Sequence, residues 1–272
     1  MSDAHGPLHV AVLSCGDLGR EVANALIGIP EVSNVCLVTA PYRRRPLGLV
    51  GKVRHVWRTQ GPAGFASIAA DKVRRALADG THDGTGAPPA GPALTAQVEH
   101  LHVADFHDET CRTALRERAP DLGVLAGTYI LRPEVFEIPR LGCINLHSGK
   151  APEYRGAAPA FWELYNGEHE VGITVHRVVA SLDAGDIIAQ ETFPLDNAPM
   201  EDPMDYIARY RHEVLRPNGV RLVVQAVAAI ARGAESARTQ DPSRAATYRT
   251  PGHREVRELR RRVGARRGRG AA

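Results

Sequence analysis

The sequence has few cysteines and no long hydrophobic run, and both absences narrow what the chain can be. Its four cysteines, which form no CxxC pair, are Cys15, Cys36, Cys111 and Cys143. This scatter argues against a zinc site or a disulfide framework, so we expect no metal and a reducing, cytoplasmic setting. No apolar run reaches the roughly 20 residues of a membrane helix, and the first residues lack a basic segment followed by an apolar one. We therefore expect neither a membrane partner nor a secretory signal.

Basic residues exceed acidic ones only slightly, and the excess lies at one end of the chain. The net charge is +3, but residues 253–272 alone contribute +6 through eight arginines and two glutamates, which leaves −3 for the rest. We expect residues 241–272 to form a C-terminal extension whose arginine-rich end is either helical or flexible and disordered. Such ends bind polyanions in a salt-dependent way. A solvated tail explains the arginines more simply, so nucleic acid is expected to be at most a weak partner.

Short apolar runs alternate with amphipathic segments, which is the pattern of an α/β protein, and the composition is that of a chain with a sizeable core. Strands are expected at residues 9–14, 34–39, 98–103, 122–126, 143–147, 172–179 and 187–194. Helices are expected at residues 20–27, 65–78, 109–118, 158–165 and 204–232 (the last interrupted at 217–219), with a basic helix or loop at 43–60 and a loop at 78–92. We predict a Rossmann-like, mostly parallel twisted sheet flanked by helices, forming a single catalytic domain over residues 8–240.

An amide, an imidazole and a carboxylate follow two of the predicted strands. Asn145 and His147 lie two residues apart at the end of one strand, so in an extended chain both side chains face the same side. Asp183 lies in the turn after another strand. Together these groups can stabilise an oxyanion, transfer a proton and orient the imidazole, which acyl transfer to an amine requires. Polar residues at strand ends and an Asp-Ala-Gly-Asp turn also have a plain structural explanation, and composition alone favours that one.

The motifs around these three residues make a more specific pattern. Residues 145–195 supply Asn145-x-His147, Pro152-x-Tyr154-Arg155-Gly156, Gly172-x-Thr174-x-His176 and Leu182-Asp183-x-Gly185-Asp186. This order resembles the folate-dependent formyltransferase family, which includes glycinamide ribonucleotide, methionyl-tRNA and sugar N-formyltransferases. The likeness extends over roughly residues 8–240 and is strong from about 121 to 195.

The resemblance implies a mechanism. The formyl donor is 10-formyltetrahydrofolate, and a substrate amine attacks the formyl carbon to give a tetrahedral oxyanion. Asn145 and protonated His147 stabilise it, His147 helps to protonate the leaving folate nitrogen, and Asp183 holds His147 or a water that relays the proton. The pterin ring is expected to contact backbone along two segments, at Leu125, Gly127, Tyr129, Ile130 and Leu131, and at Ala180, Ser181 and Leu182.

Some positions fit other roles or depart from the family pattern. Tyr129 suits a core position equally well. His176 is expected either in the core or as a support for the catalytic residues, and Trp162 suits the core or a pocket, with its helical spacing favouring the core. Gly149 stands where many members have serine, and Lys150 replaces an apolar residue. Lys150 either contacts an acidic part of a substrate or is simply solvated, and solvation is the simpler interpretation.

Several functions are compatible with these residues. The favoured one is transfer to the amine of a small molecule, such as an amino sugar or a biosynthetic intermediate. The tRNA enzymes carry a sizeable further domain, and only about 40 residues follow Gly233 here, too few for a second core. The glycinamide ribonucleotide enzyme is usually shorter and has a different opening loop. A 10-formyltetrahydrofolate hydrolase would use the same three residues, but such enzymes usually have an N-terminal regulatory domain. A nucleotide-dependent reductase would use the turn Cys15–Gly19, which lacks GxGxxG spacing.

Overall fold

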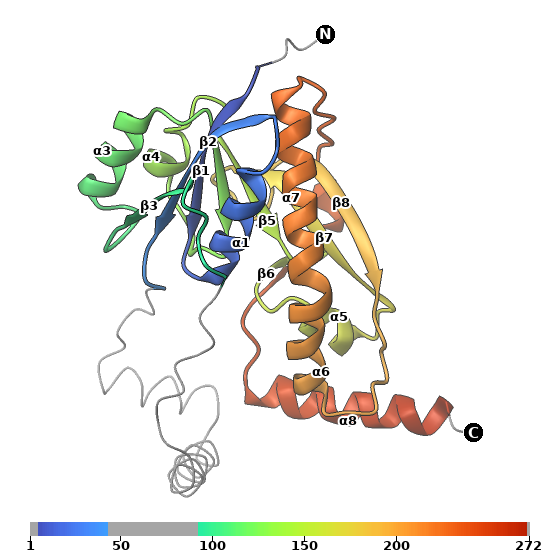
Figure 1. Ribbon diagram of the computed structural model, residues 1–272. Coiled ribbons are helices and arrows are strands. Elements are labelled where there is room, and N and C mark those ends of the chain that lie inside the picture. Colours follow the sequence, from blue (N-terminus) through green and yellow to red (C-terminus); the bar gives the residue numbers. More distant parts are fainter. Residues whose placement is uncertain (1–4, 43–91, 271–272) are drawn as a thin grey trace, which may run out of the picture.

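A seven-stranded sheet organises the chain, whose computed structural model describes residues 5–42 and 92–270 (Figure 1). The strand order is β3 (Glu99–His102), β2 (Val32–Thr39), β1 (Leu8–Ser14), β4 (Leu122–Ala126), β5 (Cys143–His147), β7 (Glu170–Arg177) and β8 (Ile187–Pro194). The first five strands are parallel, whereas β7 pairs antiparallel with β5, and β8 pairs antiparallel with β7. The predicted α/β class and mostly parallel sheet are confirmed. The segments expected at 43–60 and 65–78, and most of the loop at 78–92, lie outside the described residues.

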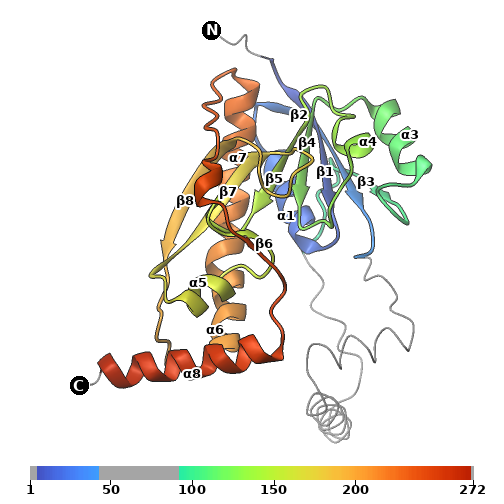
Figure 2. The same cartoon turned by 180° about the vertical axis from the view of Figure 1, so that it is seen from behind.

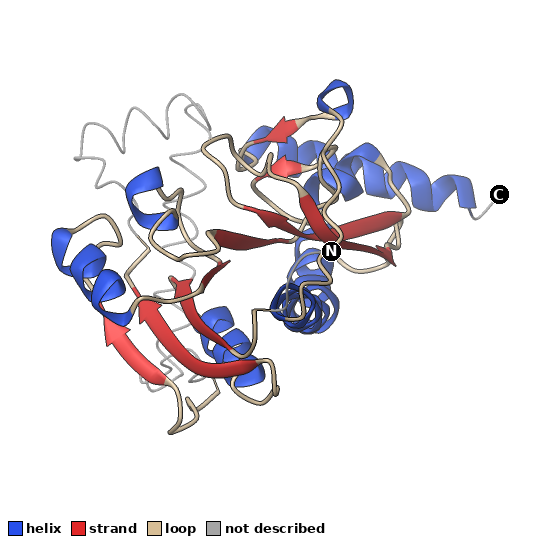
Figure 3. Cartoon of the chain, turned by 90° about the horizontal axis from the view of Figure 1, so that it is seen from above, coloured by secondary structure: helices blue, strands red, loops and turns tan. Residues whose placement is uncertain are grey.

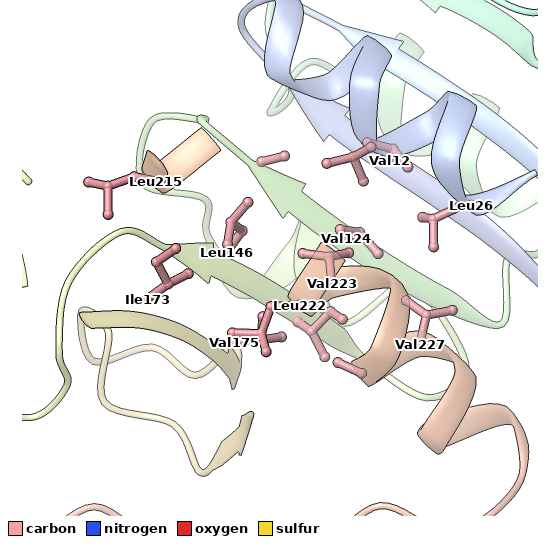
Figure 4. Close-up of a cluster of buried hydrophobic side chains, with 14 of the residues drawn as sticks. Val12, Leu26, Val124, Leu146, Ile173, Val175, Leu215, Leu222, Val223 and Val227 are labelled. Carbon is pink, nitrogen blue, oxygen red and sulfur yellow. The ribbon is translucent and has the colours of Figure 1, made fainter. Parts of the chain in front are cut away.

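Helices cover both faces of the sheet because its central strands are apolar on both sides. In β1, Val10 and Val12 belong to one buried cluster, and Ala11 and Leu13 belong to another. The first cluster also contains residues of α1 (Asp17–Leu26) and α7 (Arg216–Ala231), and Figure 4 shows it between the sheet and these helices. The second cluster includes residues of α3 (Glu109–Arg118) and α4 (Pro133–Phe136). Figure 3 shows these two helices on the opposite side of the sheet from α1 and α7.

The long helical stretch expected at 204–232 is present but is interrupted earlier than its sequence suggested. It consists of α6 (Pro203–Tyr210), a π-helical segment (Arg211–Leu215) and α7. Pro217 lies just after the π-helical segment, and its missing N–H cannot bond to the preceding helical turn, which is where the helix is irregular. By length and composition Pro203–Ala231 could cross a membrane, contrary to the expectation that no such run exists. Leu222, Val223 and Val227 of this segment are buried in the first cluster, against the sheet. A buried core helix can have the same length and apolar composition as a membrane-spanning helix.

The C-terminal extension is ordered over its described length and packs on the rest of the molecule (Figure 2). Its strand β9 (Thr247–Tyr248) pairs in parallel with β6 (Arg155–Gly156). Helix α8 (His253–Gly270) then packs against α5 (Phe161–Asn166) and α6. The side chains of Leu259 and Val263 are fully buried in the first cluster. Of the two alternatives for the arginine-rich end, the helix is therefore the one present, and the expectation of a flexible tail is replaced by a docked helix.

Candidate active site

The three residues singled out in the sequence meet at β5, beside the point where the sheet changes from parallel to antiparallel. Asn145 Nδ2 lies 3.4 Å from Asp183 Oδ1, and His147 Nδ1 lies 3.5 Å from Asp183 Oδ2. Asp183 reaches them from the loop between β7 and β8, which crosses β5 in Figure 2. One carboxylate therefore faces both the amide and the imidazole. His147 and Asp183 are each buried to about nine-tenths.

The loop that carries Asp183 is tightly constrained. Asp183 has a left-handed backbone, with φ 48°, and its Oδ2 accepts the N–H of Gly156 at 2.8 Å. Gln240 donates from its side chain to the carbonyls of Asp183 (2.9 Å) and Gly185 (2.6 Å). A Cβ on Gly185 would lie 1.8 Å from the Arg177 carbonyl oxygen, so the turn closes only with glycine there. The carboxylate is thus positioned by the backbone around it, and Gln240, which directly precedes the C-terminal extension, is part of that support.

His147 has both ring nitrogens engaged. Its Nε2–H donates to the Tyr154 carbonyl at 2.6 Å, while Nδ1 faces Asp183. Burial lowers the pKa of His147, and this outweighs the opposing effects of the Asp183 charge and the Tyr154 carbonyl. Burial also acts to raise the pKa of Asp183, but His176, His147 and the Gly156 N–H together hold that pKa below its usual value. A neutral imidazole beside an ionised carboxylate is the resting state that these directions favour.

His176 is part of the same cluster. It lies opposite Asn145 in the pairing of β5 with β7 and is almost fully buried. Its Nδ1–H donates to the Arg177 carbonyl at 2.8 Å, which leaves Nε2 to accept from Asn145 Nδ2 at 3.2 Å. Nε2 also lies 3.4 Å from Asp183 Oδ1. The histidine of the Gly-x-Thr-x-His motif therefore lies where it can orient the amide and the carboxylate, which is the supporting role that the sequence offered as one of two alternatives.

Gly149 and Lys150, the two positions that depart from the family pattern, each have a structural explanation. A Cβ on Gly149 would lie 2.4 Å from both His147 Nε2 and the Tyr154 carbonyl oxygen, so the loop approaches the imidazole this closely only with glycine. Lys150 Nζ donates to Glu170 Oε1 at 2.5 Å on the partly exposed edge of the molecule. Lys150 is thus an ion-pair partner, which agrees with the solvated interpretation rather than a substrate contact.

The two segments expected beside the pterin ring differ in exposure along their length. Leu125 and Leu131 are buried in the second cluster, and Tyr129 packs against it. The Tyr129 hydroxyl donates to Asp105 Oδ1 at 2.5 Å and accepts the Phe106 N–H at 2.7 Å, which favours its core interpretation.

Other side chains on these segments are exposed. Large apolar side chains with high exposure among the described residues include Ile130 (71%), Val179 (45%) and Leu182 (41%). Gly127 has a positive φ of 71° at the start of the first segment. Ala180 and Ser181 lie beside Leu182 in an exposed stretch. Exposed apolar side chains on two loops next to the polar cluster fit a flat aromatic ligand.

A shallow, open pocket is lined by His147 and by residues of the loop that follows it. Its walls include Trp162 and Glu163 of α5 and Tyr248 of β9; of these, only Trp162 had a pocket role among its predicted alternatives. The Tyr248 ring stacks on Tyr154 with centroids 5.2 Å apart, and also on Trp162 at 5.2 Å. Helical spacing had placed Trp162 in the core, and no sequence signal connected residue 248 with residue 147. The pocket exists because β9 brings the C-terminal extension beside β6.

Comparison with known proteins points to one family. The family model described as formyl transferase matches residues 80–216. Among curated proteins, the methionyl-tRNA formyltransferase of Bacteroides fragilis is 36% identical over 141 residues, which are 52% of this chain and 41% of that protein. The chain thus spans less than half the length of this relative. In the part of the chain that the structure describes, no cluster of His, Cys, Asp and Glu could hold a metal ion.

Solved structures share the fold at low sequence identity. A sugar N-formyltransferase from a Shewanella species superimposes with a TM-score of 0.55 at 14% identity, covering 94% of this chain and 87% of that one. HypX from Aquifex aeolicus in complex with tetrahydrofolic acid superimposes with a TM-score of 0.52 at 17% identity, covering 92% of this chain and 31% of that one.

Proposed function

Because the chain belongs to the formyl transferase family, we propose that it transfers a formyl group from 10-formyltetrahydrofolate to the primary amine of a small molecule, such as an amino sugar or a biosynthetic intermediate. The observation that carries the proposal is the Asp183 carboxylate, which lies within 3.5 Å of Asn145, His147 and His176 at once. This arrangement unites an oxyanion donor, a proton carrier and an orienting charge.

The proposed chemistry follows from which groups are free to move protons. The acceptor nitrogen bonds to the formyl carbon, and the formyl oxygen becomes an oxyanion that Asn145 Nδ2–H stabilises. Nδ1 of neutral His147, which is unprotonated because Nε2–H donates to the Tyr154 carbonyl, takes the proton that the attacking nitrogen must lose. Once charged, the ring is stabilised by Asp183 and by the Tyr154 carbonyl. His147 then passes the proton to N10 of the folate as the C–N10 bond breaks, and a formamide and tetrahydrofolate result.

The donor is proposed to bind along the two exposed apolar loops. Ile130 and Leu182 offer surface for the pterin ring, and the backbone from Leu125 to Leu131 and from Ala180 to Leu182 offers hydrogen-bonding groups for its edge. Both loops pack on the second cluster through Leu131 and Val178, which keeps them next to β5.

The acceptor has a second candidate, because the curated relative quoted above is a methionyl-tRNA formyltransferase. A shallow pocket beside His147 with an aromatic wall suits a small amine. The same pocket would also admit the terminal aminoacyl group of a tRNA. A direct comparison of amino sugars, glycinamide ribonucleotide and methionyl-tRNA as acceptors separates the classes.

The deciding experiment measures tetrahydrofolate release from 10-formyltetrahydrofolate with a panel of amines. His147→Ala and Asp183→Ala should each lower kcat by about 10²–10⁴-fold, since each removes a positioned group for proton transfer. The exposed His212 provides a matched control, and His212→Ala should keep full turnover. Full activity in either site variant would contradict the assignment. Release of formate at the same rate without any amine would instead identify a hydrolase.

A further inference from the structure

A carboxylate that the formyl-transfer scheme does not use is buried in the wall of the same pocket. Glu163 lies in the first turn of α5, is 2% exposed, and lines the pocket together with His147. No described residue donates a hydrogen bond to its Oε1, which is buried. Buried polar atoms are nearly always paired, and an unpaired carboxylate oxygen is among the most costly exceptions. Such an atom at the wall of a pocket points to a ligand that supplies the missing donor.

The electrostatics of Glu163 are those of a group able to exchange a proton near neutral pH. Burial raises its pKa to about 7, although the backbone N–H groups of Glu163 and Ala160 act in the opposite direction. Its negative charge is favoured by the N-terminal end of the helix, and none of the ion pairs between described residues includes it. A carboxyl with a pKa near the working pH is well suited to general base catalysis.

The surroundings of Glu163 favour a cationic group of modest size. Trp162, Tyr154 and Tyr248 line the same pocket and stack on one another, and aromatic rings attract ammonium ions through their π electrons. Other ionisable groups around the carboxylate come from the pocket wall, the end of α5, α6 and the docked α8: His147, Arg155, Glu168, Tyr210, Arg262 and Arg266. Arg262 and Arg266 donate to carbonyls at the C-terminal end of α5 and are not paired with Glu163.

We propose that Glu163 binds the ammonium form of the acceptor and removes one proton from it, delivering the neutral amine that attacks the formyl carbon. This assignment rests on the proposed formyl transfer. An alkyl ammonium has no lone pair, so it must lose a proton before it can act as a nucleophile. That proton goes to the Glu163 carboxylate and later to solvent. The second proton, lost after attack, goes to His147 and then to N10 of the folate, so each proton has its own acceptor.

The test compares Glu163→Gln with wild type on two acceptors that differ in basicity. One is a primary alkyl amine, which is protonated at pH 7, and the other is an O-alkylhydroxylamine, which is largely neutral at that pH. We expect the variant to lose about 10²–10⁴-fold in kcat/KM with the alkyl amine and less than about threefold with the alkoxyamine. With the alkyl amine, the loss should shrink about tenfold per pH unit as the acceptor itself deprotonates. Glu117→Gln, which neutralises an exposed carboxylate on α3, is the matched control.

The outcomes separate this assignment from the proposed function. Equal losses with both acceptors would mean that Glu163 only supports the fold, and no loss with either would mean that the acceptor does not meet it; both overturn the assignment while formyl transfer stands. The alkoxyamine rate also reports whether the variant folds. A wild-type protein that releases no tetrahydrofolate with any amine would overturn formyl transfer, and the role of Glu163 with it.

Discussion

At the scale of single residues, the site depends on which oxygen and nitrogen atoms have partners. Asp183 accepts from the Gly156 backbone and lies against two histidines, so its charge is well compensated. Glu163, in contrast, is equally buried but has an oxygen with no described donor. The two carboxylates therefore have opposite pKa shifts, downward for Asp183 and upward for Glu163. Two carboxyl groups whose pKa values are shifted in opposite directions can have different proton-transfer roles in one site.

The raised pKa of Glu163 predicts a pH-dependent effect on stability. Its pKa rises from 4.5 to about 7 on folding, so its contribution is most favourable below pH 4.5 and is lost as the pH rises through 7. Glu163→Gln does not ionise, and it should therefore become more stable relative to wild type by roughly 3 kcal/mol between pH 4 and pH 8. Urea unfolding across this range measures the difference. A difference independent of pH would show that the carboxylate is not desolvated, and Glu117→Gln should give that flat result.

At the scale of elements, the C-terminal extension packs on the rest of the molecule and forms part of the pocket wall. β9 places Tyr248 against Tyr154 and Trp162, and Gln240, which directly precedes the extension, holds the Asp183 turn. Arg266 of α8 donates to the carbonyl of Leu164 at 2.7 Å, and so binds the end of the helix that carries Glu163. Basic side chains at a helix C-terminus are favourable because the last carbonyls lack helical partners. The extension therefore connects the two catalytic regions of the proposed mechanism.

Because α8 is docked through apolar side chains, replacing one of them should lower stability strongly, although most residues of this segment are polar or charged. Leu259 is fully buried against the main cluster, so Leu259→Ala should lower the free energy of unfolding by about 2–5 kcal/mol. Because α8 supports α5, activity should also become more sensitive to temperature. The exposed Arg254 lies on the same helix, and Arg254→Ala should change stability by less than about 0.5 kcal/mol. Equal stability of both variants with wild type would mean that α8 is not docked in solution.

At the scale of the whole molecule, the distribution of charge bears on whether the acceptor is a small amine or an aminoacyl-tRNA. The net charge of +3 arises from the C-terminal segment, and several arginines there are already engaged. Arg260 contacts Asp202, and Arg262 contacts Glu258 and lies over the Tyr165 ring, 4.0 Å from its centroid. Such arginines contribute to packing more than to a free basic surface.

This distribution predicts how turnover depends on salt. With a small amine as acceptor, kcat/KM should change by less than about threefold between 50 and 200 mM salt, because few counterions are released. With an aminoacyl-tRNA acceptor, several phosphate contacts would make it fall by tenfold or more. The double variant Arg254→Gln, Arg257→Gln removes two exposed charges and should leave the small-amine rate unchanged. A steep salt dependence that this variant weakens would favour the tRNA as substrate.

Much of this protein follows from local sequence alone. The strands 122–126, 143–147 and 187–194 and the helix 109–118 are present with the predicted bounds, because period and flanking turns determine such elements. Two residues at spacing i, i+2 on a strand must share a face, so Asn145 and His147 were predictable as a pair, and the motif around Asp183 supplied the third member.

The tertiary structure decided what no local pattern encodes. Whether residues 253–270 are a free tail or a docked helix depends on Leu259 and Val263 finding an apolar surface, which α5 and α6 provide from elsewhere in the chain. The contact of Tyr248 with Tyr154 and Trp162 likewise arises from pairing between strands that are about 90 residues apart. The sequence thus determined the sheet and the reactive groups on β5, whereas long-range packing determined the pocket beside them and the burial of Glu163 in its wall.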